Sequence, residues 1–196
     1  MSDLFDLSGK VAIVTGSSLG IGRATAEAMA AHGAKVVVSS RKPEKCEIVA
    51  EGIKKEGGDA IVIPCHCSHK DQLQNLVDKT LDTWGKIDIL VCNAAVNPFY
   101  GSLSEIPEDA YDKTMNTNVK SNVWLTSMVI PQMIKIGGGS IIIVSSVAAL
   151  IGSAKLGTYG LSKAADVALA RNLAVEWGGD NIRANCINPA IIRTNF

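Results

Sequence analysis

Apolar runs alternate with helical repeats along the whole chain. The runs are continuous and rich in β-branched residues, as in Lys35 to Ser39 (KVVVS), and do not alternate between apolar and polar positions. Strands covered on both faces have this pattern, because neither face meets water. Strands are predicted at residues 10–15, 35–39, 60–65, 87–92, 139–145 and 182–187, and helices at 20–32, 43–56, 70–84, 108–134 and 158–177.

The strict alternation of strand and helix predicts the architecture. Neighbouring parallel strands need a crossover connection, and right-handed crossovers place helices on both faces of one sheet. We therefore expect a doubly wound α/β fold of the Rossmann kind, with a parallel sheet of six strands. No linker, internal repeat or low-complexity segment divides the chain, so residues 1–196 are expected to form a single domain.

Composition excludes several classes of protein. Hydrophobic residues make up 47% of the 196 residues and charged residues 19%, the reverse of the balance typical of disordered chains. The 19 basic residues equal the 19 acidic ones, so there is no basic excess to bind nucleic acid or an anionic membrane. The five cysteines are odd in number and not densely spaced, which predicts free thiols in a reducing compartment.

Two further observations favour a cytoplasmic protein without a membrane partner. The start of the chain lacks the basic and apolar regions of a signal peptide. The longest nearly apolar run, Ile141 to Ile151, is too short to span a bilayer.

The first predicted strand is followed by a glycine-rich loop, Thr15 to Gly22 (TGSSLGIG). Gly16 permits a tight turn, while Gly20 and Gly22 allow the backbone and the next helix to approach a ligand closely. A helix N-terminus attracts the pyrophosphate of a dinucleotide. The loop therefore indicates a dinucleotide-binding domain; the alternative is a plain glycine-rich turn between strand and helix.

From this loop onward the chain resembles the classical short-chain dehydrogenases/reductases. The loop has the family's T-G-x3-G-x-G pattern. Further matches are Asn93-Ala94-Ala95-Val96 for N-[NA]-A-G, Asn116 to Val119 for N-x-N-V, Tyr159 to Lys163 for Y-x3-K, and Pro189 to Thr194 for P-G-x3-T. Val96 and Ala190 stand where the family usually has glycine. Within the family, the motifs are most similar to those of NADP-dependent carbonyl and retinal reductases.

The resemblance implies a catalytic group of Asn118, Ser146, Tyr159 and Lys163. Tyr159 and Lys163 are four residues apart, so they share one face of a helix. An ammonium beside the phenol is expected to lower its pKa, so that Tyr159 can act as general acid or base near neutral pH. Ser146 would polarise a carbonyl group, and Asn118 would hold a water that relays protons to Lys163. The alternatives are a solvated pair, a capping serine and an asparagine bonded locally.

The end of the second predicted strand, Ser39 to Lys42, bears on the choice of cofactor. An NAD site needs an acidic residue here for the ribose 2′-hydroxyl, whereas an NADP site has a basic residue for the 2′-phosphate. Ser40 stands where the family's acidic residue would be, and Arg41 and Lys42 follow it. NADP(H) is therefore expected over NAD(H); the alternative is two solvated basic residues in a loop.

The resemblance extends to the remaining binding residues. His66 and Cys67 stand where the family contacts the adenine, although His66 can equally be a loop histidine without a partner. Phe99 and Ala148 are expected at the substrate. No metal site is expected, because Cys65 to His69 has one C-x-C and no second ligand pair. The expected cofactor-binding residues are Gly16, Ser18, Gly20, Ile21, Gly22, Ser40, Arg41, Lys42, His66, Cys67, Asn93, Ala94, Ala95, Tyr159, Lys163, Pro189, Ile192 and Thr194.

The expected function is hydride transfer between NADP(H) and a carbonyl compound or secondary alcohol. Two alternatives remain: a 3-oxoacyl-carrier-protein reductase, and a non-catalytic protein that senses the cofactor. Family members are usually longer, so the sequence is expected to lack the family's C-terminal substrate lid and last strand. By resemblance, helices 108–134 and 158–177 pair in a homo-oligomer, a dimer or tetramer, and a purely structural subunit is a further alternative.

Overall fold

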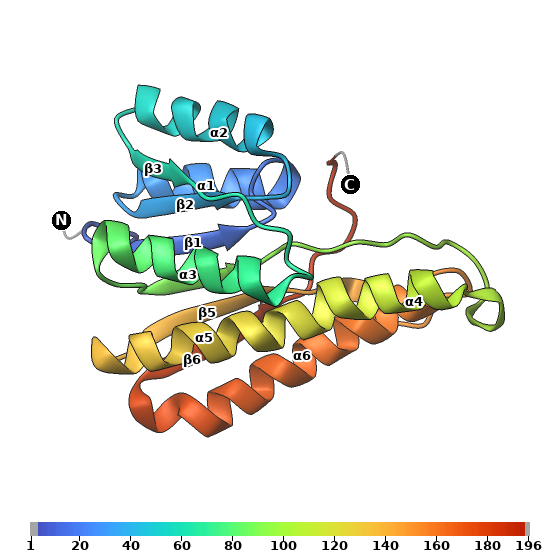
Figure 1. Ribbon diagram of the computed structural model, residues 1–196. Coiled ribbons are helices and arrows are strands. Elements are labelled where there is room, and N and C mark those ends of the chain that lie inside the picture. The colour runs from blue at the N-terminus through green and yellow to red at the C-terminus, as the bar shows by residue number, and fades with distance from the viewer. Residues whose placement is uncertain (1–3, 195–196) are drawn as a thin grey trace.

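The structure, a computed structural model, describes residues 4–194, which form one parallel sheet with helices on both faces (Figure 1). The six strands lie in the order β3-β2-β1-β4-β5-β6. They are β1 (Val11–Thr15), β2 (Lys35–Ser39), β3 (Asp59–Val62), β4 (Ile89–Cys92), β5 (Gly139–Val144) and β6 (Ile182–Ile187). All neighbouring strands pair in parallel. The predicted doubly wound α/β fold is confirmed.

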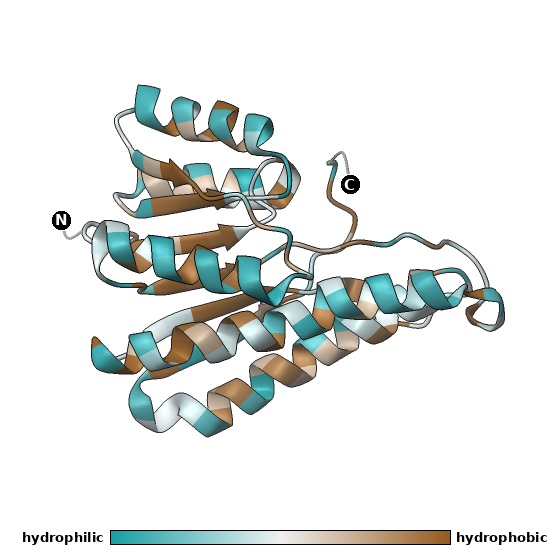
Figure 2. Ribbon diagram, viewed as in Figure 1, coloured by the Kyte–Doolittle hydropathy of each residue, from teal (hydrophilic) through white to brown (hydrophobic). Residues whose placement is uncertain are grey.

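The helices are divided between the two faces of the sheet. α1 (Gly20–Ala31) and α2 (Pro43–Lys55) cover one face, and α3 (Lys70–Trp84), α5 (Ser121–Lys135) and α6 (Gly157–Trp177) cover the other (Figure 1). Hydrophilic residues lie on the outer sides of α2 and α3, while α6 also has apolar residues on its outer side (Figure 2). α6 is therefore not a simple amphipathic surface helix.

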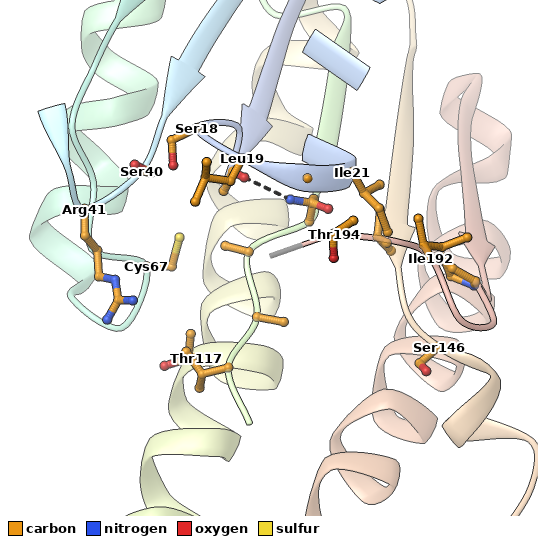
Figure 3. Close-up of a pocket in the computed structure, with 18 of the residues that line it drawn as sticks. Ser18, Leu19, Ile21, Ser40, Arg41, Cys67, Thr117, Ser146, Ile192 and Thr194 are labelled. Carbon is orange, nitrogen blue, oxygen red and sulfur yellow. Dashed lines mark hydrogen bonds between the residues drawn. The ribbon is translucent and has the colours of Figure 1, made fainter. Parts of the chain in front are cut away.

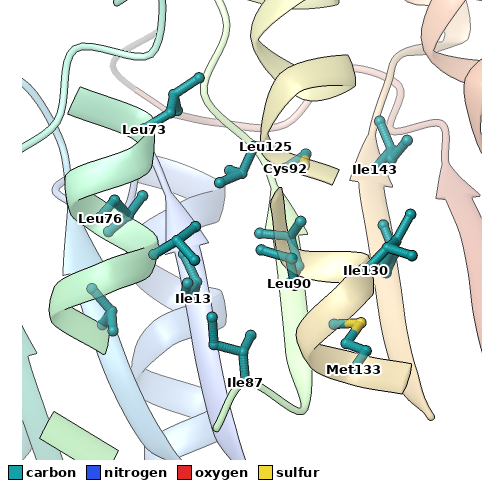
Figure 4. Packing of buried hydrophobic residues seen from close by; sticks show 14 of the residues in the cluster. Ile13, Leu73, Leu76, Ile87, Leu90, Cys92, Leu125, Ile130, Met133 and Ile143 are labelled. Atoms are coloured by element: carbon teal, nitrogen blue, oxygen red, sulfur yellow. The ribbon is translucent and has the colours of Figure 1, made fainter. Parts of the chain in front are cut away.

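Two hydrophobic clusters fill the space between sheet and helices. Along β1, Ile13 belongs to the cluster under α3 and α5, whereas its neighbours Ala12 and Val14 belong to the cluster under α1 and α2. Figure 4 shows Ile13 and Leu90 facing Leu76 of α3. Because successive side chains of a strand point to opposite faces, a strand buried on both faces must be apolar throughout. This explains the continuous apolar runs.

The structure differs from the predicted elements by more than one residue at three places. The strand predicted at 87–92 begins at Ile89. The strand predicted at 60–65 spans Asp59–Val62, although backbone hydrogen bonds to β2 and the residue after it continue as far as Cys65. The helix predicted at 108–134 is divided into α4 (Glu108–Met115), a π-helical turn over Asn116–Lys120, and α5. Such π-helical turns are frequent at functional sites.

The strand order predicts an opening at the carboxyl ends of β1 and β4. Chain connections run outward from β1 on one side and from β4 on the other, so their loops diverge where these two strands end. Ligands of open α/β sheets bind at such a switch point. In the described part of the chain, no helix is both long and apolar enough to cross a membrane.

Candidate active site

A cavity of about 400 Å³ opens at the carboxyl ends of the strands, within the size range of small-molecule sites (Figure 3). Segments far apart in the sequence line it, from the glycine loop to the residues that follow β6. The lining residues are Gly16, Ser18, Leu19, Gly20, Ile21, Ser40, Arg41, Lys42, Lys45, Cys65, His66, Cys67, Asn93, Ala94, Ala95, Val96, Thr117, Val144, Ser145, Ser146, Tyr159, Lys163, Pro189, Ala190, Ile192 and Thr194.

The glycine loop forms one wall of this cavity. Gly16 has φ +67°, a conformation that other residues rarely adopt. A methyl group on Gly22 would overlap with Asn93 Nδ2 and with the carbonyl oxygen of Gly16, so only glycine allows α1 to begin this close to the loop. Leu19 precedes α1 and gives no side-chain cap. The N-terminus of α1 is therefore open to an anionic ligand.

Hydrogen bonds join the ends of β1 and β4 beneath the cavity. Thr15 Oγ1 accepts from the backbone N–H of Asn93 at 3.0 Å and of Ala94 at 3.1 Å. Asn93 Nδ2 donates to the carbonyl oxygens of Thr15 at 2.9 Å and of Gly16 at 3.3 Å. These contacts fix the position of the glycine loop relative to the segment that follows β4.

Ser146, Tyr159 and Lys163 lie together at one end of the cavity. A hydrogen bond joins Tyr159 to Ser146. The Lys163 Nζ atom lies 5.8 Å from the centroid of the Tyr159 ring, and this lysine is 2% exposed. Its ammonium donates to the carbonyl oxygen of Val144 at 2.8 Å and to Asp166 at 3.0 Å. The spacing of Tyr159 and Lys163 therefore places both at the site, as the sequence predicts.

The pKa of Tyr159 differs from the sequence-based expectation, which was wrong in direction. Burial raises the pKa of the phenol above its usual value. The hydrogen bond with Ser146 lowers this pKa by less, and the Asp166 carboxylate raises it further. The sequence could indicate that Lys163 is nearby, but not that a buried carboxylate sits beside the ammonium.

The two consecutive serines at the end of β5 have different environments. Ser145 is buried, and its hydroxyl donates to the carbonyl oxygen of Lys163 at 2.7 Å, which ties β5 to α6. Ser146 is half-buried, and its Oγ accepts from the backbone N–H of Ala148 at 3.2 Å as well as bonding Tyr159. Ser146 is therefore the serine that is placed beside the tyrosine.

Asn118 lies behind the cavity and not on its wall. It is fully buried in the π-helical turn, and its Nδ2 donates to the carbonyl oxygen of Val96 at 2.9 Å and to Ser162 Oγ at 3.0 Å. Its Oδ1 accepts from the backbone N–H of Val96 at 2.8 Å. Both amide protons are thus used within the protein, so the side chain connects the segment after β4 to α6 and has no proton left for a relay water.

Basic side chains gather at the other end of the cavity. Arg41 and Lys42 follow β2, and Lys45 lies three residues further along in the first turn of α2. Ser40 Oγ accepts from the backbone N–H of Lys42 at 3.2 Å. In Figure 3, Arg41 lies at the end opposite Ser146. This end therefore suits a phosphate group.

His66 and Cys67 form the wall between Arg41 and the interior. His66 has a partner, because its Nδ1 lies 2.8 Å from Ser68 Oγ, and its ring makes an edge contact with His69. Burial lowers the pKa of His66, and His69 and Arg41 lower it further, which favours the neutral ring. Within residues 4–194, no group of three or more His, Cys, Asp or Glu residues is arranged to hold a metal ion.

The cavity accounts for most of the expected site residues but not for four of them. Gly22 and Asn118 lie behind its wall, and Phe99 and Ala148 are not among its lining residues. Sequence reasoning missed Lys45, whose position one turn after Lys42 could have indicated it. The other residues missed are Leu19, Cys65, Val96, Thr117, Val144, Ser145 and Ala190; they contribute mainly backbone or small apolar surface, which leaves little sequence signal.

A protein-family model described as short chain dehydrogenase matches residues 10–196. The chain belongs to this family of oxidoreductases. It is 45% identical over 190 residues to Dehydrogenase/reductase SDR family member 4 of Bos taurus, covering 97% of this chain and 68% of that protein. It is 44% identical to the protein of the same name from Homo sapiens, with the same coverage.

Solved structures of the family have the same fold. A 7α-hydroxysteroid dehydrogenase complexed with NADH and 7-oxo glycochenodeoxycholic acid has a TM-score of 0.96 and 36% identity, covering 100% of this chain and 76% of that one. A short-chain type dehydrogenase/reductase from Mycobacterium marinum has a TM-score of 0.93 and 36% identity, covering 97% of this chain and 78% of that one.

The family uses a nicotinamide cofactor, and the residues present fit one. The space above Gly16 and the open N-terminus of α1 match a pyrophosphate. The basic end at Arg41 suits the adenosine half of a dinucleotide, and the end with Lys163 suits the nicotinamide half.

Substitution of Gly22 by alanine tests the close approach of α1 to the loop. Gly22→Ala is expected to weaken cofactor binding roughly tenfold or more, because displacing packed backbone costs about 1–3 kcal/mol. Calorimetric titration with the cofactor measures this. Gly52→Ala in α2 is the matched control, since a methyl group there meets nothing within 4 Å. It should keep the wild-type affinity and raise the free energy of unfolding by about 0.5–1 kcal/mol; equal affinities for the two variants would contradict the argument.

Proposed function

We propose that this protein transfers hydride between NADP(H) and a carbonyl compound or its secondary alcohol. The observation that supports this most is the shared cavity, which has Ser146, Tyr159 and Lys163 at one end and Arg41 with Lys42 at the other. A nicotinamide dinucleotide bound in this cavity would supply or accept the hydride.

The protein side chains handle the proton and the polarisation of the substrate. In reduction, Ser146 donates a hydrogen bond to the carbonyl oxygen and Tyr159 gives its proton to that oxygen as negative charge develops there. Lys163 has three N–H groups, of which Val144 and Asp166 engage two. The third is available to a ribose hydroxyl at the cavity. In oxidation, Tyr159 takes the proton back.

The preference for NADP(H) rests on charge at the end of β2. Ser40 brings no carboxylate to the ribose, whereas Arg41, Lys42 and Lys45 bring positive charge. An arginine can form two parallel hydrogen bonds with a phosphate. The structurally similar 7α-hydroxysteroid dehydrogenase is described with NADH, so a direct comparison of the two cofactors is informative.

Removal of the Tyr159 hydroxyl tests the reaction. Tyr159→Phe is expected to lower kcat by about 10²–10⁴-fold with cofactor affinity retained, because a general acid–base group contributes this much. NADPH oxidation is followed by absorbance with ketones, aldehydes and a β-ketoacyl thioester. Tyr111→Phe, at an exposed tyrosine of α4, is the control and should turn over normally.

The substrate panel also separates the alternatives. Turnover confined to the thioester would indicate a 3-oxoacyl-carrier-protein reductase. Tight NADPH binding without turnover of any substrate would indicate a cofactor-sensing protein and refute the proposed reaction.

The choice of cofactor is tested at Arg41. Arg41→Ala is expected to raise the Kd for NADP(H) about 10- to 100-fold, since a hydrogen bond to a charged group contributes about 1.5–3 kcal/mol. The Kd for NAD(H) should change little. Arg171→Ala, at an exposed arginine of α6 outside the cavity, should change neither. Tighter binding of NAD(H) than NADP(H) by the wild-type protein would refute the proposed preference.

We also propose that the protein is a homo-oligomer in a reducing compartment such as the cytoplasm. Val175 on the outer side of α6 is 88% exposed, and Leu161 on the same helix is 52% exposed, which is apolar surface that a second copy could cover. All five cysteines are free thiols.

The oligomer is tested by placing charge on that surface. Size-exclusion chromatography with light scattering should give a dimer or tetramer for the wild type and a smaller species for Val175→Glu, because a buried unpaired carboxylate is costly at an interface. Ile48→Glu, at a 63% exposed isoleucine of α2, is the control and should keep the wild-type mass. A monomeric wild-type protein would defeat the proposal.

A further inference from the structure

A buried carboxyl group that the proposed reaction does not use, that of Asp166, contacts Lys163. Asp166 is on α6 three residues after Lys163 and is 0% exposed. Its Oδ2 accepts from Lys163 Nζ at 3.0 Å, and its Oδ1 accepts from Asn122 Nδ2 of α5 at 2.9 Å. Both carboxylate oxygens therefore have partners in the interior, and one of these partners is a residue of the active site.

Further hydrogen bonds hold this ion pair in one geometry. Asn122 Nδ2 also donates to the carbonyl oxygen of Asn118 in the π-helical turn at 2.7 Å. Lys163 Nζ also donates to the carbonyl oxygen of Val144 at the end of β5 at 2.8 Å. The ammonium is thus held between β5 and Asp166, with one N–H left over.

The other titratable groups around the pair are neutral. Cys92 of β4 and Cys186 of β6 both face Asp166, and burial, followed by the Asp166 carboxylate, raises the pKa of each thiol. α5 contributes uncharged groups at this place, Asn122 and Ser121. Burial raises the pKa of Asp166, and the contacts with Lys163 and Asn122 lower it by less. Within the described residues, the charges of this pair are the ones placed to act on Tyr159: Lys163 Nζ lies 5.8 Å from the centroid of its ring, and the Asp166 carboxylate raises its pKa.

We propose that Asp166 is a positioning residue for the reaction, the counter-ion that aims the Lys163 ammonium and limits the positive charge that it presents to Tyr159. This inference rests on the proposed function, because it assigns Asp166 a role through Lys163. An isolated ammonium would stabilise the phenolate strongly, whereas a paired one has much of its field cancelled.

The test is the pH at which Tyr159 loses its proton. Asp166→Asn removes the negative charge and keeps an oxygen for Lys163, so the pKa of Tyr159 should fall. The limb of the pH–rate profile that reports Tyr159 should move to lower pH by roughly 0.5–1 unit, the size expected for one charge about two helical turns away in a medium of intermediate dielectric constant. Both the falling limb in reduction and the rising limb in oxidation should move in this direction.

A control separates this effect from a structural one. Thr126→Val removes a buried hydroxyl on α5 that bonds the carbonyl oxygen of Asn122, without any change of charge. It should leave the midpoint of the profile where it is, whatever it does to stability. If Asp166→Asn lowers kcat or the melting temperature while the midpoint stays fixed or rises, Asp166 is a structural residue and the proposal is wrong.

Two readouts do not depend on turnover, so failure of the proposed function would leave this inference testable. The phenolate absorbance of Tyr159, obtained as the difference from Tyr159→Phe, should titrate at lower pH in Asp166→Asn than in the wild type. Where Asp166→Asn does not fold, Asp166→Ala replaces it, since alanine suits a helix and leaves Asn122 bonded to Asn118.

The second readout is a double-mutant cycle on stability. Lys163→Met leaves the buried Asp166 carboxylate without its ion-pair partner. This variant should therefore melt at a lower temperature than the double variant Lys163→Met/Asp166→Ala, which has no charge there. A double variant that melts below both single variants would show that the two residues do not act as an ion pair, and would overturn the proposal.

Discussion

The position of the active site depends on how the ends of β1 and β4 are held. The strand order reverses between these neighbours, so their connections leave in opposite directions and open the cavity. The β1–β4 ladder ends at Val14 and Val91, and beyond it the hydroxyl of Thr15 and the side-chain amide of Asn93 make the contacts between the two strand ends. Because these contacts fix the glycine loop against the segment that follows β4, the two ends of the cavity keep one spacing.

The Lys163–Asp166 pair is costly for a protein to bury. Replacing a buried ion pair by apolar residues is often neutral or stabilising, so stability alone gives no reason to keep it. Lys163 is nevertheless 2% exposed and also bonded to β5. The proposed reaction needs an ammonium there, and an unpaired ammonium would carry the full cost of desolvation. Asp166 offsets that cost, and in doing so it also reduces the effect of the charge on Tyr159.

Sequence alone predicted the fold because the central strands β1 and β4 are buried on both faces and β2 nearly so, which leaves continuous apolar runs between helical repeats. The glycine loop, the tyrosine–lysine pair and the basic residues after β2 have a physical reason for their spacing, whereas the other expected site residues followed from the family resemblance. Sequence could not predict the hydrogen bonds and ion pairs that buried side chains make with residues distant in the chain. The Asn118 amide is used by Val96 and Ser162, far away in the sequence. In the sequence, nothing distinguishes Asp166 from an exposed acidic residue on a helix, although the structure buries it completely.

The raised pKa of Tyr159 has a consequence for the direction of the proposed reaction. At neutral pH the phenol in this structure keeps its proton, because burial and Asp166 together outweigh the hydrogen bond from Ser146. The protonated phenol is the form that gives a proton to a carbonyl oxygen, whereas alcohol oxidation requires the phenolate. For the proposed reaction, a raised pKa of Tyr159 would therefore suit the reduction step near neutral pH and the oxidation step at alkaline pH.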